Sequence, residues 1–106
     1  MAIKTYNKLV RDLIPQIIQK SGNECKIRVL SNEEYINMID VKLDEELAEY
    51  HHDKNIEELA DLLELIRAAT IARGYTLEDL EAVRAEKAKQ RGGFEKKIFL
   101  VSVDEK

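Results

Sequence analysis

Two amphipathic segments flank a break of only three residues, and this short break constrains the fold more than any other feature of the chain. On both sides of residues 53–55, apolar side chains recur at three- and four-residue steps, which is typical of helices with one buried face. Helices joined by so short a loop must run antiparallel. The sequence therefore predicts an antiparallel pair of helices, over residues 31–51 and 55–74.

Start and stop signals predict four helices in all. Proline suits the first turn of a helix, Ser or Thr followed three residues later by an acid is a capping-box pattern, and glycine commonly follows the last turn. In chain order, the signals are Pro15 and Gly22 for a short helix, Ser31 with Glu34 for the second, Asn55 and Gly74 for the third, and Thr76 with Asp79 and Gly92-Gly93 for the fourth.

Two further segments are strand-like. Residues 25–30 alternate apolar and basic side chains, and residues 97–103 are rich in β-branched and aromatic side chains. We expect them to pair as a small two-stranded element. The predicted fold is mainly α, an antiparallel helical bundle of about four helices with this β element, in a single domain over residues 1–106.

Composition narrows the class of protein. The single cysteine, Cys25, allows no intrachain disulfide and fits a reducing compartment, so a cytoplasmic protein is expected. The apolar runs are far shorter than the ~20 residues that span a bilayer, and no signal-peptide pattern is present. A net charge of -4 with six aromatic residues disfavours a nucleic-acid polymer as partner. A chain of 106 residues builds a small core, and helices with one long apolar face often complete such a core by oligomerising.

Charge is segregated along the chain. Residues 31–64 hold twelve acidic side chains against Lys42 and Lys54, whereas residues 1–28 and 84–97 each hold six basic side chains against two acidic ones. Like charges repel, so this pattern suits an acidic block that binds cations between basic flanks that meet an anionic ligand. A merely solvated acidic helix face is the alternative.

Four of these acids form matched pairs about the break between the two helices. Glu49 and Glu58 are equally distant from its centre, and so are Glu46 and Asp61. At ~1.5 Å rise per residue the members of each pair lie at about the same height on neighbouring helices. A spacing of three residues places both acids of each helix on one face. Glu45 lies beside these pairs.

Convergent carboxylates repel one another unless a cation neutralises them. All-oxygen ligands favour magnesium, with manganese as an alternative, and Mg²⁺ shares its coordination shell with substrate phosphates. The acidic centre with basic flanks therefore favours metal-assisted phosphoryl chemistry. Glu45 would orient or deprotonate the attacking water, or serve a second ion.

Three motifs in order resemble the all-α nucleotide pyrophosphohydrolases, which include MazG-like enzymes and phosphoribosyl-ATP pyrophosphohydrolases. The first looks like the opening of the small MazG-like proteins, the second like the EExxE…ExxD signature of the superfamily, and the third like a closing motif. They are Asn7-Lys8-Leu9-Val10-Arg11-Asp12-Leu13-Ile14-Pro15, then Glu45-Glu46-Leu47-Ala48-Glu49 with Glu58-Leu59-Ala60-Asp61, then Gln90-Arg91-Gly92-Gly93-Phe94.

The resemblance implies magnesium-dependent cleavage of a nucleoside triphosphate or related nucleotide between its α and β phosphates, as in house-cleaning of non-standard nucleotides. It also implies a dimer or tetramer of helical bundles. The N-terminal segment and the tail differ from the enzyme that acts on phosphoribosyl-ATP, which argues against a role in histidine biosynthesis. The implied site residues are Glu46, Glu49, Glu58 and Asp61 as metal ligands, Glu45 as the catalytic or second-metal residue, and Lys8, Arg11, Lys87 and Arg91 as candidate phosphate contacts.

Other interpretations stay open. A non-catalytic oligomerisation or regulatory module of the same fold, or a protein that holds a nucleotide without cleaving it, would share these residues, although a degenerate relative would be expected to have lost some of the acids. Glu49-x-x-His52 is half of a di-iron pattern, but no second half exists. The four basic candidates are equally compatible with ordinary surface charge, and Cys25 with a small buried hydrophobe.

Overall fold

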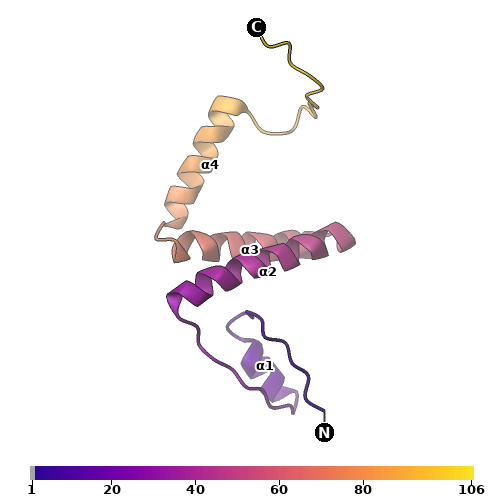
Figure 1. The fold of residues 1–106 in the computed structure, drawn as a ribbon, viewed down its shortest axis with the longest axis vertical. Helices are drawn as coiled ribbons and strands as arrows, with labels where there is room; N and C mark the ends of the chain where they lie inside the picture. Colours follow the sequence, from indigo (N-terminus) through magenta and orange to yellow (C-terminus); the bar gives the residue numbers. More distant parts are fainter. Residues whose placement is uncertain (1) are drawn as a thin grey trace. The chain divides into compact units, whose positions relative to one another are not determined.

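The computed structural model describes residues 2–106, and it is mainly helical, as the sequence predicts. Its four helices are α1 (Ile14–Lys20), α2 (Asn32–Asp53), α3 (Ile56–Ala72) and α4 (Leu77–Arg91) (Figure 1). The chain divides into two compact units. The first ends at Tyr75, and the second begins at Thr76. We call them the N-terminal unit, with α1 to α3, and the C-terminal unit, with α4.

The helices begin where the capping signals place them. Ser31 and Glu34 form a complete capping box before α2, and Thr76 and Asp79 form another before α4. The side chain of Asn55 accepts a hydrogen bond of 3.0 Å from the backbone N–H of Glu58 at the start of α3. Each side chain satisfies a backbone donor that the helix leaves unpaired, which fixes where the helix starts.

Helices α2 and α3 pack against each other in the N-terminal unit (Figure 1). Two residues connect them. Lys54 takes the left-handed conformation with φ 52°, and its N–H donates a hydrogen bond of 2.8 Å to the carbonyl of Tyr50, closing the last turn of α2. The chain therefore reverses at once, and the predicted antiparallel pair is confirmed.

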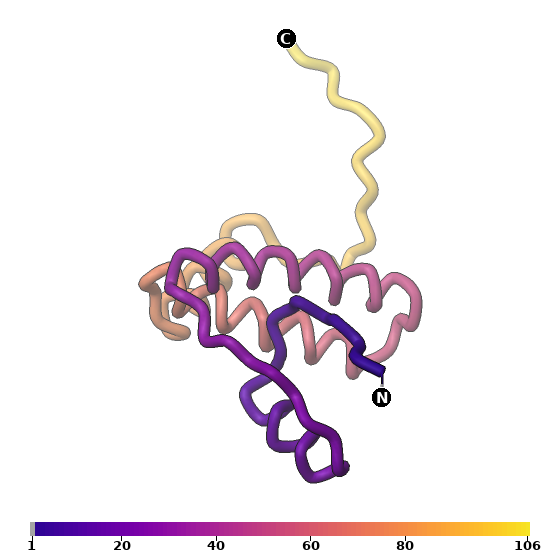
Figure 2. The backbone as a smooth tube through the Cα atoms, turned by 60° about the horizontal axis from the view of Figure 1, so that its bottom comes forward, coloured from indigo at the N-terminus to yellow at the C-terminus, as the bar shows by residue number. Residues whose placement is uncertain are grey.

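The N-terminal segment, residues 2–13, has no helix or strand. It runs alongside the α2–α3 pair (Figure 2), and ion pairs attach it to α2 through Lys8 and to α3 through Arg11. A turn at residues 12–13 leads into α1, where Pro15 occupies the first turn as expected.

The predicted two-stranded element is absent from the described chain, residues 2–106. Neither residues 25–30 nor residues 97–103 form a strand, and they belong to different compact units. A strand is stabilised by hydrogen bonds to a neighbouring strand, so an alternating or β-branched segment without a partner stays irregular. The β part of the fold prediction was wrong for this reason.

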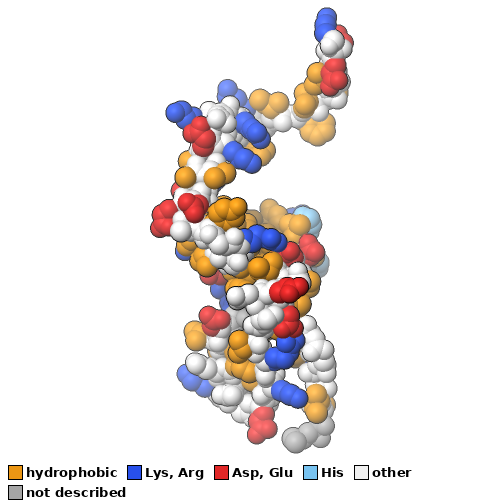
Figure 3. All heavy atoms as spheres, turned by 60° about the vertical axis from the view of Figure 1, so that its left-hand side comes forward, with side chains coloured by type: hydrophobic (Ala, Val, Ile, Leu, Met, Phe, Trp, Pro, Cys, Tyr) orange, Lys and Arg blue, Asp and Glu red, His pale blue; other side chains and the backbone are white. Residues whose placement is uncertain are grey.

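Apolar side chains are largely exposed. Within the part of the chain that the structure describes, Ile39 on α2 is the only buried hydrophobic residue, at 1% exposure. Hydrophobic side chains are accordingly visible at the surface in Figure 3. The apolar stripes of α2 and α3 contribute Leu47, Leu59, Leu63 and Ile66, each more than two-fifths exposed.

Among the described residues, none of the helices has the length and apolar character that crossing a membrane requires.

Candidate functional site

The α2–α3 pair brings the predicted acids together in two overlapping groups. One carboxylate oxygen from each of Glu45, Glu46 and Glu49 lies within 4.8 Å of the others, and the same holds for Glu46, Glu58 and Asp61. Glu46 belongs to both groups, and the second group joins the two helices. The predicted proximity of Glu46 and Asp61 is thus present in the structure. Oxygens at such distances are able to share one cation.

Glu46 is buried in a way that is unusual for an acid. The residue is 8% exposed, and its Oε2 atom has no hydrogen-bond partner. The Oε2 atom of Glu58 is likewise buried and unpartnered. Buried polar atoms are normally paired, because leaving one unpaired costs about 1–3 kcal/mol and more if it is charged. Two such oxygens, from Glu46 and Glu58, lie in the group that includes Asp61.

Electrostatic strain accompanies this burial. Burial, followed by the charge of Glu49, raises the pKa of Glu46 above its ordinary value. Burial, followed by the charges of Glu49, Asp53, Asp61 and Glu46, also raises the pKa of Glu58. Both shifts mean that the folded chain resists carrying full negative charge here. The repulsion of Glu49 on Glu58 also fits the second predicted pair.

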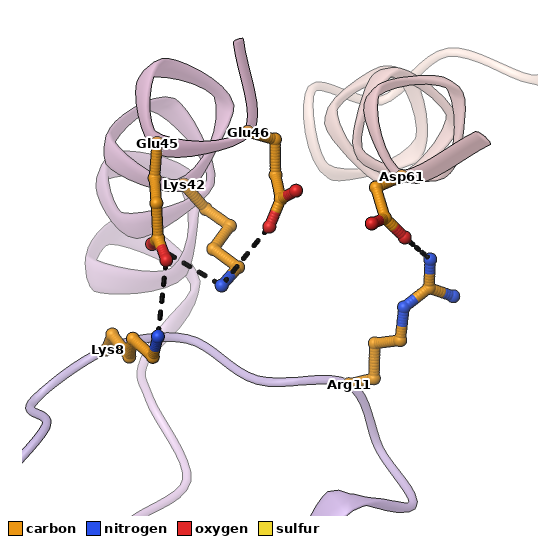
Figure 4. Close-up of polar contacts among 6 residues, drawn as sticks. All are labelled: Lys8, Arg11, Lys42, Glu45, Glu46 and Asp61. Carbon is orange, nitrogen blue, oxygen red and sulfur yellow. Dashed lines mark hydrogen bonds and ion pairs between the residues drawn. The ribbon is translucent and has the colours of Figure 1, made fainter. Parts of the chain in front are cut away.

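Lys42 is the cation closest to the buried acid. Its Nζ atom lies 3.4 Å from Oε2 of Glu45 and 3.5 Å from Oε1 of Glu46 (Figure 4). The lysine side chain is only 18% exposed. Because it stands three and four residues before these acids, one face of α2 carries all three side chains.

Lys8 brings a second cation to Glu45. Its Nζ atom donates a hydrogen bond of 3.2 Å to Oε1 of Glu45 (Figure 4). Burial disfavours the charged form of Glu45, but the hydrogen bonds and charges of Lys8 and Lys42 outweigh it and lower the pKa of this carboxyl. Glu45 therefore differs from its neighbours Glu46 and Glu58, because it is held as a carboxylate.

Arg11 contacts the opposite helix. Its guanidinium donates a hydrogen bond of 2.6 Å to Oδ1 of Asp61, and its side chain is 60% exposed (Figure 4). The N-terminal segment thus places one basic side chain on each helix of the pair. The structure brings two of the four predicted phosphate contacts, Lys8 and Arg11, directly to the carboxylates.

The other two predicted contacts, Lys87 and Arg91, lie on α4, with Arg91 as its last residue. They belong to the C-terminal unit. Their role in phosphate binding stays a prediction.

The remaining reactive side chains lie outside the carboxylate groups. His52 is exposed and contacts the neighbouring Asp53 at 2.6 Å, which raises the pKa of the imidazole. Cys25 is a free, half-buried thiol whose Sγ lies 4.0 Å from the carbonyl of Pro15. Neither makes a contact with the acids that would indicate a di-iron site or an activated nucleophile.

A hollow of about 320 Å³ lies elsewhere in the N-terminal unit, between the N-terminal segment and the start of α2. Its one basic side chain, Arg28, is engaged by Glu34 at 3.0 Å. Among the described residues, no other basic side chain lines it. The hollow is lined by Leu9, Asp12, Arg28, Val29, Leu30, Asn32 and Tyr35.

The sequence interpretation missed Lys42 as a member of the site. Lys42 was named there only as one of two basic residues within the acidic block, residues 31–64. The signal was present, since a lysine three and four residues before two acids faces them on a helix. Its burial was not predictable from the spacing, because burial depends on how α2 packs.

Comparisons with known proteins give a partial relative and no family. The chain is 55% identical over 42 residues to an uncharacterized protein of Mycolicibacterium smegmatis, and these residues cover 40% of this chain and 43% of that protein. The chain thus spans less than half the length of this relative. No family model matches the chain, and no solved structure matches it.

The raised pKa values predict how stability depends on pH. A carboxyl with a folded-state pKa above its ordinary value of 4.5 contributes stability that is fully present below 4.5 and is lost as pH rises through the folded-state pKa. We therefore expect the free energy of unfolding of the metal-free protein to rise as the pH falls from neutral toward 4.5. Urea denaturation followed by circular dichroism measures it.

Glu46→Gln isolates the contribution of the buried acid. The variant should be more stable than the wild type at neutral pH and should gain less on acidification. The exposed pair of His52 and Asp53 changes stability in the same direction, but it is present in both proteins and cancels in the comparison. Glu64→Gln, which removes an acid of α3 outside both groups, is the control. An unchanged pH dependence in Glu46→Gln would contradict the assignment.

Proposed function

We propose that this chain is a magnesium-dependent nucleotide pyrophosphohydrolase, which cleaves a nucleoside triphosphate or related nucleotide between its α and β phosphates. One observation carries the proposal: Oε2 of Glu46 and Oε2 of Glu58 are buried and unpartnered in the group that they form with Asp61. A divalent cation is the ligand that two such oxygens call for, since hard cations take carboxylate oxygens.

The chemistry of the donors fits magnesium. The group offers carboxylate oxygens alone, without the thiolate or imidazole ligands that select zinc or copper. Glu46, Glu58 and Asp61 would hold the ion, with Glu49 beside them. Manganese, which also prefers oxygen ligands, is the alternative. When bound, the ion supplies Lewis-acid polarisation of the substrate phosphate and neutralises its charge.

Glu45 would act on the attacking water. An ionised carboxylate accepts the water proton as the oxygen forms its bond to phosphorus and the bond to the bridging oxygen of pyrophosphate breaks. The pKa of Glu45 is lowered by Lys8 and Lys42 while both contact it. If Lys8 leaves Glu45 for a substrate phosphate, the carboxylate becomes a stronger base when the substrate is in place.

Lys8 and Arg11 would bind the phosphates. Their pairs with Glu45 and Asp61 involve side chains that are more than one-third exposed, and such pairs are weak and exchangeable. A triphosphate is a stronger acceptor for a guanidinium than a single exposed carboxylate, because it offers charged oxygens for paired hydrogen bonds. Lys87 and Arg91 remain candidates for the same role.

The motifs that resemble the all-α nucleotide pyrophosphohydrolases support the same proposal. The opening motif contains Lys8 and Arg11, two of the three cations that contact the acids among the described residues, and the central motif contains all five acids. A substrate of this kind and the free thiol of Cys25 suit a reducing cytoplasm. The presence of all five acids and of buried unpartnered oxygens favours a metal-binding protein over a module that serves only for oligomerisation, in which burying them would cost stability without a compensating ligand.

We also propose that the chain assembles with copies of itself, as a homodimer or homotetramer. The apolar stripes of α2 and α3 are exposed, and a single buried hydrophobic residue in the described chain is too little to stabilise a domain. A second copy, which carries the same stripes, would complete a helical bundle.

Magnesium-dependent release of pyrophosphate tests the activity. We expect the purified protein to release pyrophosphate from at least one standard, deoxy or damaged nucleoside triphosphate, and Glu49→Gln to reduce the rate at least ~100-fold, because changes near a metal typically cost 10- to 100-fold even outside the first shell. Glu64→Gln should keep the wild-type rate. No release from any member of such a screen would refute the enzymatic proposal.

Arg11→Gln tests phosphate binding by the N-terminal segment. A charge-assisted hydrogen bond contributes about 1.5–3 kcal/mol, so the variant should raise the KM for the nucleotide ~10-fold or more. Lys4→Gln, which removes a cation of the same segment that lies over the Tyr6 ring, is the matched control. Equal KM values for both variants would exclude a specific contact by Arg11.

Sedimentation velocity tests self-association. The wild type should sediment as a dimer or tetramer, and Leu63→Glu, which places a charge on the apolar stripe of α3, should shift it toward the monomer. Asn37→Glu adds a charge at an exposed polar position of α2 and should leave the assembly intact. A monomeric wild type at micromolar concentration would contradict the proposal.

A further inference from the structure

We propose that Lys42 takes the place of a second metal ion, so that each chain holds one divalent ion, beside Glu46, Glu58 and Asp61. The inference rests on the proposed metal site and adds to it the number of ions and the reason for that number. It starts from the two overlapping carboxylate groups and from the position of one lysine between them.

The two groups together have the layout of a two-ion site. Glu46 belongs to both of them. In two-metal centres the ions lie about 3.5–4 Å apart and commonly share a bridging ligand. By position alone, one ion would lie among Glu45, Glu46 and Glu49, and another among Glu46, Glu58 and Asp61.

Lys42 already provides a cation in the first group. Its Nζ atom lies 3.4 Å from Glu45 and 3.5 Å from Glu46, so its single positive charge is shared between the two carboxylates (Figure 4). It contacts Oε1 of Glu46 and leaves Oε2 unpartnered. Oε1 of Glu46 is therefore occupied by the lysine, and Oε2 is left to bind the ion of the second group.

The second group, in contrast, lacks a buried cation. Oε2 of Glu58 is unpartnered, and within residues 2–106 the one basic side chain that pairs with Asp61 is the largely exposed Arg11. Glu46 is itself more than nine-tenths buried, so water does not compensate its free oxygen. An ion bound among Glu46, Glu58 and Asp61 would therefore give the largest electrostatic stabilisation.

The charge balance agrees with one ion. Five carboxylates lie in the two groups, and three cations contact them, which leaves a net charge of two negative units. One divalent ion cancels this charge. Two ions would leave an excess of positive charge unless a basic side chain departed.

Lys42 is the cation that departs least easily. Its side chain is 18% exposed, against 38% for Lys8 and 60% for Arg11. It also stands on the same helix as Glu45 and Glu46, so the backbone of α2 keeps it near them. Lys8 and Arg11 belong to an irregular segment and are free to exchange partners.

A titration with Mn²⁺ alone, followed by electron paramagnetic resonance of free Mn²⁺, tests the inference without a nucleotide. The wild type should bind one ion per chain. Lys42→Gln, which removes the charge but keeps most of the side chain, should bind a second ion. Lys42→Arg should bind one, because it restores the charge, and Lys20→Gln, at the exposed end of α1, should match the wild type. Circular dichroism checks that each variant is folded.

The possible results distinguish the role of Lys42 from the existence of the metal site. Two ions in the wild type would overturn the role of Lys42 and leave the proposed enzyme standing. One ion in both wild type and folded Lys42→Gln would also overturn it, because the lysine would not be what excludes the second ion. Absence of any Mn²⁺ binding by the wild type would overturn the metal site and this inference together.

Discussion

The two-residue connection between α2 and α3 is the constraint on which the candidate site depends. It reverses the chain within a single turn, with Lys54 in a left-handed conformation and Asn55 as the cap of the next helix. A helix pair closed this tightly has little freedom to slide. Glu46 and Asp61 are therefore held close to each other, although fourteen residues of chain lie between them.

The electrostatic repulsion among the gathered acids is offset at Glu45 but not fully at Glu46 and Glu58. Glu45 is neutralised by basic side chains of the protein itself, which keeps it ionised. Glu46 shares Lys42 with Glu45, and Glu58 forms no ion pair within the described residues. The raised pKa values and unpartnered oxygens of both acids show the remaining imbalance. The acidic cluster thus contains one carboxylate with basic partners, Glu45, and two acids with an unpartnered oxygen, Glu46 and Glu58. These two acids are the ones that a ligand would stabilise.

Helices and their ends could be predicted from the sequence because they depend on nearby residues, such as Ser31 with Glu34 or Asn55 with the N–H of Glu58. The proximity of Glu46 and Asp61 was predictable because the short loop fixes the register of α2 and α3. Residues 25–30 and 97–103 were not, because a strand depends on a distant partner that periodicity does not identify. The burial of Lys42 and Glu46 likewise depends on packing, which no single spacing encodes.

The acidic and the basic side chains of the candidate site come from parts of the chain with different structure. Acids that would hold a cation come from rigid, capped helices, whereas Lys8 and Arg11 come from chain without regular structure. Substitutions or length changes in residues 2–13 would alter the basic side chains presented to an anion without disturbing the helix pair. Under the proposed function, the residues that bind the substrate phosphates would therefore belong to a part of the chain separate from the acidic centre, and the one could change in sequence while the other stays the same.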